Sequence, residues 1–157
     1  MALIRFVAMP TEEVRAYQCG APDAYGNPPE RKVSDGSGIP CRHCLQHVAA
    51  GEEYLVLAYR PFPSLQPYAE TGPIFLHLRE CTRAPEGDVL SPMFRITPDY
   101  ILRGYGSDDR IVYGTGGVVP THMICGRAHE LLAREEVAYV HMRSARNNCY
   151  QLRIERA

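Results

Sequence analysis

Short apolar runs separated by turn-forming residues follow one another along most of the chain. Residues 3–9, 53–59 and 74–78 have the apolar character and length of strands, and 53–59 is the strongest of the three. Proline ends this strand at Pro61, because it removes a donor from the hydrogen-bond ladder. A loop then leads to the next run, so 53–59 and 74–78 are expected to pair as an antiparallel hairpin with a wide connection.

The second half of the chain predicts further strands that pair with their neighbours. Residues 94–96 and 100–105 are expected to be extended, with 110–113 as the returning strand after a turn. Residues 137–144 and 149–155 alternate apolar and polar side chains, which predicts a C-terminal hairpin. Its apolar face would carry Val140, Met142, Leu152 and Ile154, and its polar face His141, Arg143, Gln151 and Arg153.

Two segments have the pattern of a helix. One begins at residues 10–13, which include an acidic first turn, and ends near Gly20. The other covers about 121–135. Its apolar residues recur at helical spacing, at Ile124, Ala128, Leu131 and Leu132. Residues 20–40 are rich in Gly, Pro, Asp, Ser and Asn, and are expected to form a long structured loop.

The predicted strands outnumber the helices, and strands close in sequence look like hairpin partners rather than parallel crossovers. This pattern favours an α+β fold, with a mixed or mainly antiparallel sheet and one or two helices packed on it. A chain of 157 residues is long enough for one domain with a hydrophobic core and short for two. With no internal repeat or linker in view, we expect residues 1–157 to form a single domain.

Composition narrows the classes of partner. The formal net charge is −1, and no basic strip surrounds residues 41–81, so neither nucleic acid nor an anionic membrane is an expected partner. No signal peptide is visible in residues 1–9, and no apolar run approaches the about 18 residues of a membrane span. The cytoplasm is therefore the expected compartment. In that reducing environment cysteines are more often buried, metal-bound or catalytic than paired in disulfides.

The cysteine and histidine pattern predicts a metal site. Cys41 and Cys44 form a C-x2-C pair, and His77 and Cys81 follow after the expected hairpin. Zinc takes four sulfur and nitrogen ligands in tetrahedral geometry, and a tight C-x2-C turn aims two sulfurs at one point. We therefore predict a zinc site made of these four residues. His43 lies inside the pair and is an alternative ligand to His77, although a contact with solvent or substrate is the favoured interpretation.

Other interpretations of these cysteines stay open. Cys41 and Cys44 can be buried core residues, or a thiol redox pair that forms a reversible disulfide. Cys149 and His141 lie on neighbouring strands of the predicted C-terminal hairpin. They would form a cysteine–histidine nucleophile pair only if they shared one face of that hairpin.

Two groups of polar residues are candidates for binding a small ligand. Tyr59, Arg60, Tyr68 and Glu70 flank the central hairpin and are expected to line a pocket next to the metal site. His141, Arg143 and Asn147 belong to the C-terminal hairpin, whose polar face suits an anionic ligand. The alternative for that face is simple exposure to water, which is common for antiparallel sheets. Asn147 and Asn148 are also interpreted as turn residues.

Several longer strings are similar to one protein family. They include Asn27-Pro28-Pro29-Glu30-Arg31, Pro40-Cys41-Arg42-His43-Cys44, Pro67-Tyr68-Ala69-Glu70-Thr71-Gly72 and Arg143-Ser144-Ala145-Arg146-Asn147-Asn148-Cys149. The sequence resembles, over nearly its whole length, a bacterial family catalogued as domain-of-unknown-function family 1203. The resemblance implies a stand-alone, single-domain bacterial protein, and it brings no activity, ligand or catalytic residue with it.

Three functional hypotheses follow. The first is a small-ligand-binding protein stapled by structural zinc, since four protein ligands leave no open position on the metal. The second is an enzyme with a cysteine–histidine or metal centre that acts on a small anionic substrate. The third is a thiol redox protein that uses Cys41 and Cys44.

Overall fold

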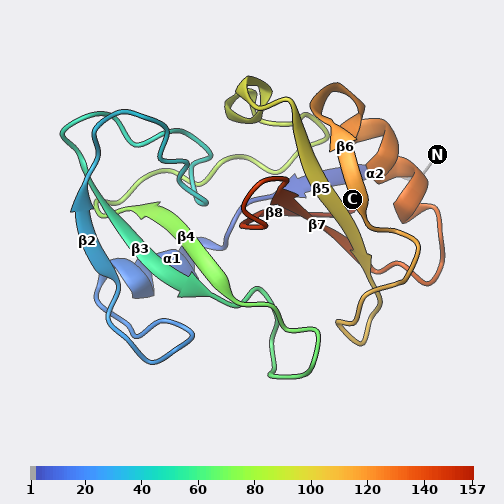
Figure 1. The fold of residues 1–157 in the computed structure, drawn as a ribbon, viewed down its shortest axis with the longest axis horizontal. Coiled ribbons are helices and arrows are strands. Elements are labelled where there is room, and N and C mark those ends of the chain that lie inside the picture. Colours follow the sequence, from blue (N-terminus) through green and yellow to red (C-terminus); the bar gives the residue numbers. More distant parts are fainter. Residues whose placement is uncertain (1–2) are drawn as a thin grey trace.

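Five antiparallel strands form the larger of two sheets in the computed structural model, which describes residues 3–157. Their order across the sheet is β1-β8-β7-β5-β6. The strands are β1 (Ile4–Val7), β8 (Tyr150–Arg156), β7 (Tyr139–Ser144), β5 (Asp99–Tyr105) and β6 (Gly117–Pro120). Figure 1 shows β5 to β8 together, with the N-terminal strand beside β8.

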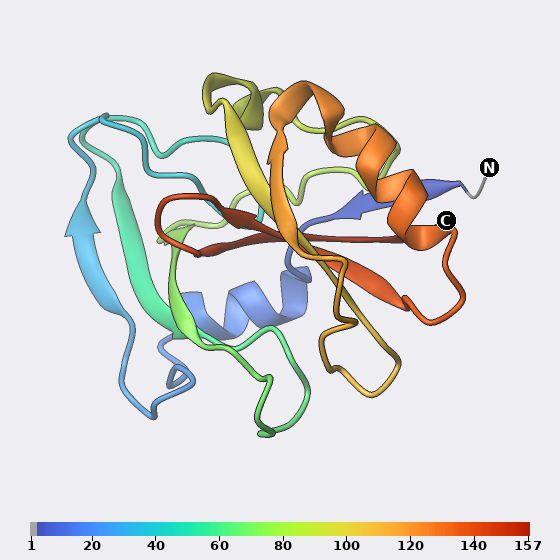
Figure 2. The ribbon, with the colours of Figure 1, turned by 45° about the vertical axis from the view of Figure 1, so that its right-hand side comes forward.

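The apolar face of this sheet packs against helix α2 (Ile124–Leu132), which lies over it in Figure 2. A short 3-10 turn, Thr121–Met123, leads into the helix. The expected apolar residues of the C-terminal hairpin and of this helix are all buried in one cluster. The period-two pattern of the hairpin and the period-3.6 pattern of the helix thus predicted residues of the same hydrophobic core. Both predictions are confirmed.

The smaller sheet has the order β2-β3-β4 and is also antiparallel. It consists of β2 (Glu30–Val33), β3 (Glu53–Tyr59) and β4 (Gly72–His77), and β4 lies beside β8. The central hairpin is confirmed: Tyr54 pairs with His77 at one end and Tyr59 with Gly72 at the other. Helix α1 (Thr11–Gln18) lies beneath β3 and β4 and buries Val14 against them (Figures 1 and 2).

Three local expectations were wrong. Strand β2 lies inside the segment expected to be a loop, and its four residues are all exposed, so it has no apolar periodicity to detect. Residues 94–96 belong to a 3-10 turn, Pro92–Ile96, which buries Phe94. The strand that returns along β5 is β6, not 110–113, where Ile111 alone makes an isolated bridge to Tyr105.

The polar face of the C-terminal hairpin is not a wet surface. His141, Arg143 and Gln151 are 1%, 3% and 5% exposed. Phe62, just after β3, packs on His141, and Glu70, just before β4, reaches Arg143. The second sheet and its connecting loop cover this face, so the solvent-exposed interpretation is wrong for these three residues.

The α+β class is confirmed, with two antiparallel sheets instead of the expected one. Among residues 3–157, no helix has the length and apolar content needed to cross a bilayer.

Candidate metal centre

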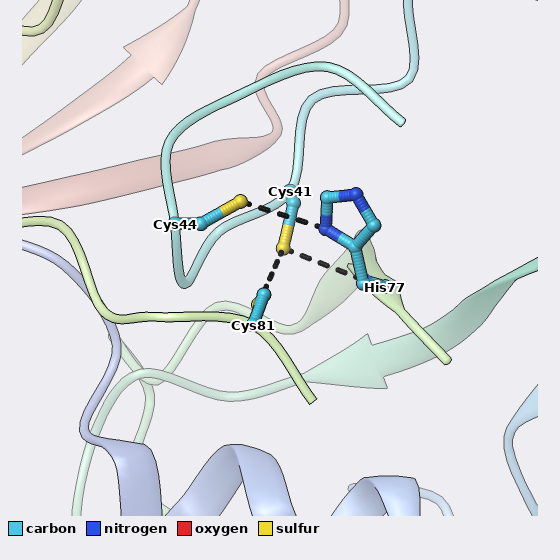
Figure 3. A group of neighbouring side chains, drawn as sticks. All are labelled: Cys41, Cys44, His77 and Cys81. Carbon is cyan, nitrogen blue, oxygen red and sulfur yellow. Dashed lines mark hydrogen bonds between the residues drawn. The ribbon is translucent and has the colours of Figure 1, made fainter. Parts of the chain in front are cut away.

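The four predicted metal ligands converge on one point. The Sγ atoms of Cys41, Cys44 and Cys81 and a ring nitrogen of His77 all lie within 4.8 Å of one another. Figure 3 shows their side chains pointing toward a common centre from the loop before β3, the end of β4 and the loop after it. Residues 40 positions apart in the sequence thus share one site.

Backbone hydrogen bonds explain how the C-x2-C loop reaches β4. Cys41 makes a parallel bridge to Phe75, and the Arg42 N–H donates to the Phe75 carbonyl at 3.1 Å. The Leu45 N–H donates to the Cys41 carbonyl at 3.1 Å, and Leu45 has φ of 54°, in the left-handed region. A tight turn laid along β4 therefore brings both sulfurs to the level of His77.

The distances between ligand atoms match those of a tetrahedral zinc site. Zinc–sulfur and zinc–nitrogen bonds of about 2.3 and 2.0 Å place sulfurs about 3.8 Å apart, and sulfur and nitrogen about 3.5 Å apart. Cys44 Sγ lies 3.5 Å from His77 Nδ1, and Cys41 Sγ lies 4.0 Å from Cys81 Sγ. These two distances fit zinc, and since all the ligand atoms lie within 4.8 Å of one another, the others need shifts of at most about 1 Å.

The surroundings of Cys41 favour its thiolate, whereas hydrogen bonds to Cys41 and Cys44 raise the pKa of Cys81. Cys41 is fully buried, and its Sγ accepts the His77 backbone N–H at 3.4 Å. Hydrogen bonds from the thiols of Cys44 and then Cys81 hold the pKa of Cys41 far below its usual value. The pKa of His77 is raised to about 10, by its hydrogen bonds to Cys41 and then Cys44. Positive charge is therefore favoured between Cys41 and His77, and a divalent metal ion would supply it.

Glu52 and His43 form a second layer around the ligands. The Glu52 carboxylate lies 3.5 Å from His77 Nε2, the ring nitrogen opposite the one that faces Cys44. His43 Nδ1 lies 3.0 Å from Cys81 Sγ, and its Nε2 lies 2.8 Å from the Thr11 hydroxyl. Metal-binding histidines commonly have a carboxylate partner of this kind, which orients the ring.

His43 is not a solvent contact. It is 0% exposed, and burial lowers its pKa. Its 3.0 Å approach to Cys81 is a hydrogen-bond distance, shorter than the about 3.5 Å between ligands that share a zinc ion. His43 therefore orients Cys81, and His77 is the better fourth ligand.

Helix α1 fixes the segment that carries the last two ligands. The Gln18 amide donates to the His77 and Arg79 carbonyls at 2.8 and 3.0 Å, and Arg15 donates to the Cys81 carbonyl at 2.9 Å. The sequence predicted the four candidate ligands but missed these helical partners. No spacing rule connects them to Cys81, because the contact depends on how α1 packs under β4.

A surface cavity of about 940 Å³ borders the site. Cys44, His77 and Cys81 line it together with Glu52, whereas Cys41 lies behind them. The centre is therefore accessible from one side.

The first group of ligand candidates does not lie next to this centre. Tyr59 is at the opposite end of the β3–β4 hairpin from His77, and its hydroxyl donates to Glu13 at 3.1 Å. Arg60 donates to the Phe62 carbonyl, and Tyr68 pairs through its hydroxyl with Tyr113. The expected pocket beside the metal is therefore wrong, because the hairpin's full length separates the two.

Glu70 joins the second group of candidates instead. Its carboxylate lies between Arg103, with which it forms a close ion pair, and Arg143, at 3.3 Å. Asn148, and not the exposed Asn147, completes this contact by donating to Glu70 at 3.3 Å. The turn interpretation of Asn148 is confirmed by its φ of 56°.

Cys149 and His141 do not form the nucleophile pair considered above. His141 pairs with Arg153 in the middle of the hairpin, whereas Cys149 lies in the turn, where its N–H donates to the Ser144 hydroxyl. The ring of His141 is surrounded by aromatic side chains, not by a thiol. These are Phe62, Tyr105, Tyr139 and Tyr150.

Comparison with known proteins gives one match. A family model described as a protein of unknown function, DUF1203, matches residues 38–156. This range includes all four candidate ligands and also Glu70, Arg103 and Arg143, which we call the arginine cluster. No curated protein and no solved structure matches the chain.

Proposed function

Since the chain belongs to DUF1203, a family of proteins of unknown function, its role is inferred from its own residues, and we propose a zinc-stapled protein that binds a small ligand. The metal ligands are Cys41, Cys44, His77 and Cys81. The observation that carries the proposal is the convergence of three thiols and one imidazole within 4.8 Å.

The donor set selects the metal. Thiolate and imidazole ligands in tetrahedral arrangement are typical of zinc, whereas calcium and magnesium take oxygen ligands. Glu52 supplies the outer carboxylate that such histidines commonly have, at 3.5 Å from His77.

In this proposal the zinc is structural. Four protein ligands complete a tetrahedron and leave no position for a reacting water. The ion would join the loop before β3 to the end of β4 and to the segment held by α1, and so reinforce the hydrogen bonds that already connect these three pieces of chain. Ligand binding would then take place elsewhere on the fold, with a small molecule as the partner and the cytoplasm as the compartment.

One observation supports the enzyme hypothesis. The cavity of about 940 Å³ reaches three of the four ligands, so a substrate that displaces one of them has access to the metal. The redox hypothesis, a reversible disulfide between Cys41 and Cys44, rests on the nearness of their sulfurs, which lie within 4.8 Å of each other.

Metal analysis of protein purified without added zinc tests the proposal. We expect about one equivalent of zinc per chain in the wild type and in Cys19→Ser, which removes an exposed thiol distant from the cluster ligands in sequence. Cys41→Ser should lose most of it. A fully folded, metal-free wild-type protein would refute the zinc staple, and a reversible disulfide in that protein would support the redox alternative.

A further inference from the structure

Buried polar atoms without partners gather in one place between the two sheets. Among residues 3–157, five buried side-chain nitrogen or oxygen atoms have no hydrogen-bond partner. Four of them belong to Tyr105, His141 and Arg143: the Tyr105 hydroxyl, His141 Nδ1, and Nε and Nη2 of Arg143. Because an unpaired buried polar group costs about 1–3 kcal/mol, this concentration indicates a bound partner.

Strand register places these three residues on one face. Arg103 pairs with His141 and Tyr105 with Tyr139 across β5 and β7, and Arg143 follows His141 by two positions. Cross-strand partners and residues two apart share a face of a sheet. The same face is the one covered by the β3–β4 connection, so the unpaired atoms lie away from water.

Hydrogen bonds of good geometry occupy one side of the Arg143 guanidinium only, and the Tyr105 hydroxyl lies near it. Burial raises the pKa of Tyr105, and the charge of Arg143 counteracts this rise. Nη1 of Arg143 donates to the Asn148 carbonyl at 3.2 Å and lies 3.3 Å from the Glu70 carboxylate. The unpaired Nε–H and Nη2–H point in the same direction and make up the edge that holds a carboxylate with two parallel hydrogen bonds. Arg143 is 3% exposed, so its neighbours hold that edge in a fixed position.

Charge at this point favours an anion. Arg103 and Arg143 together carry two positive charges against one negative charge on Glu70. The charge of Arg153 also acts on His141, but Arg153 is paired with Glu155 at 2.7 Å. His141 adds no further charge, because burial first and the charge of Arg143 second lower its pKa well below the usual value. One monovalent anion would therefore neutralise the cluster, whereas a dianionic phosphate would leave it negative.

The rest of the surroundings are aromatic. The rings of Phe62, Tyr105 and Tyr150 lie 4.9 to 5.1 Å from the ring of His141, measured between centroids. In such a poorly hydrated environment a charged hydrogen bond is stronger than in water, and an unpaired charge is more costly.

We propose that this cluster binds the carboxylate group of a small organic acid. Arg143 would hold the carboxylate through Nε and Nη2, the Tyr105 hydroxyl would donate a third hydrogen bond, and His141 Nδ1–H a fourth. This inference rests on the ligand-binding half of the proposed function and is independent of the zinc. In this proposal the arginine cluster is the ligand site, and the ligands are monocarboxylates.

Acetate and benzoate are suitable probes. Sodium acetate and sodium benzoate should raise the melting temperature of the zinc-loaded protein, and sodium chloride at the same ionic strength should not. Isothermal titration calorimetry should give a 1:1 stoichiometry. Arg143→Gln should abolish the response, and Tyr105→Phe, which keeps the ring and its packing, should weaken binding by about tenfold through loss of one hydrogen bond.

Arg127→Gln is the matched control, since Arg127 is a partly exposed arginine on α2 whose partner is Glu130. It should respond as the wild type does. If neither acid stabilises the wild type beyond the chloride control, the inference fails. It also fails if Tyr105→Phe, folded and loaded with zinc, binds both probes as tightly as the wild type.

The outcomes separate this inference from the proposed function. If neither acid binds a wild-type protein that holds its zinc, the carboxylate site is overturned and the zinc staple stands. Loss of zinc in the wild type, measured on the same samples, would overturn the staple without changing the result for the acids.

Discussion

The carboxylate of Glu52 lies 3.5 Å from Nε2 of His77, on the side of the imidazole ring away from Cys44. This contact links an exposed residue before β3 to a ligand at the end of β4. It orients the ring so that Nδ1 faces the sulfurs, a role that outer carboxylates commonly have in zinc sites.

Glu52→Gln is expected to weaken zinc binding by about 10- to 100-fold, because the variant loses the charge that increases the basicity of His77. Competition with a chromophoric chelator measures the affinity. Glu53→Gln is the control, since its carboxylate pairs with Arg31 on β2 and not with the ligands. Equal affinities of the two variants would exclude this role for Glu52.

Removal of zinc should expose two of the ligand thiols. In the zinc-loaded protein, an alkylating reagent near neutral pH should modify the exposed Cys19 quickly, and Cys41, Cys44 and Cys81 slowly. After chelation Cys44 and Cys81, which line the surface cavity, should react faster, whereas the fully buried Cys41 should stay slow. Peptide mapping by mass spectrometry can follow each thiol. Rates of Cys44 and Cys81 that do not change on chelation would show that no metal protects them.

Arg42 connects the C-x2-C loop, residues 41–44, to strand β8 of the larger sheet. It is 2% exposed, and it donates from Nε to the Tyr150 carbonyl at 2.6 Å and from Nη1 to the Pro40 carbonyl at 2.7 Å. Burial lowers its pKa to about 10, so it stays protonated at neutral pH. Arg42→Lys cannot make both contacts, and we expect a loss of about 2 kcal/mol or more in the free energy of unfolding.

Urea unfolding measures this loss. Arg127→Lys, at a partly exposed position on α2, should change the stability by less than about 0.5 kcal/mol. If Arg42→Lys is as stable as this control, the hydrogen bonds of Arg42 to Tyr150 and Pro40 do not stabilise the contact between the C-x2-C loop and the larger sheet.

His141 should make stability fall in acid. Its pKa in the folded protein is lowered by burial and by the charges of Arg143, Arg153 and Arg103, so the unfolded state takes up a proton first as the pH falls. The free energy of unfolding is therefore expected to decrease below about pH 6.5, by at most about 1.4 kcal/mol per pH unit from this group.

His141→Gln should reduce this slope between pH 7 and 5, and the exposed His122→Gln should not. Urea unfolding in buffers without carboxylates gives the slopes, and both variants share any contribution from loss of metal. A slope unchanged in His141→Gln would mean that this imidazole is not buried as a neutral group.

The sequence predicted the elements whose patterns are local. Strand β3, the two hairpins and the core of α2 follow from period-two and period-3.6 runs, and the four ligands follow from sulfur and nitrogen spacing. The exposed β2 has no such pattern, because its backbone pairs with β3 while its side chains face water.

Long-range packing explains the other misses. Alternation in the C-terminal hairpin separates two faces, and it does not say what covers each. His141 and Arg143 are buried only because the β3–β4 connection folds over them. In the same way, Glu70 lies 73 positions before Arg143 in the sequence and beside it in the fold. Glu70 was predicted for a pocket beside the metal and Arg143 for the face of the C-terminal hairpin, and the fold places both residues in one cluster.

X-ray absorption at the zinc edge of the purified wild-type protein reports directly on the atoms bound to the metal. We expect a four-coordinate zinc with three sulfur neighbours at about 2.3 Å and one nitrogen at about 2.0 Å. A shell dominated by nitrogen and oxygen, or a protein that binds no zinc, would contradict the zinc staple.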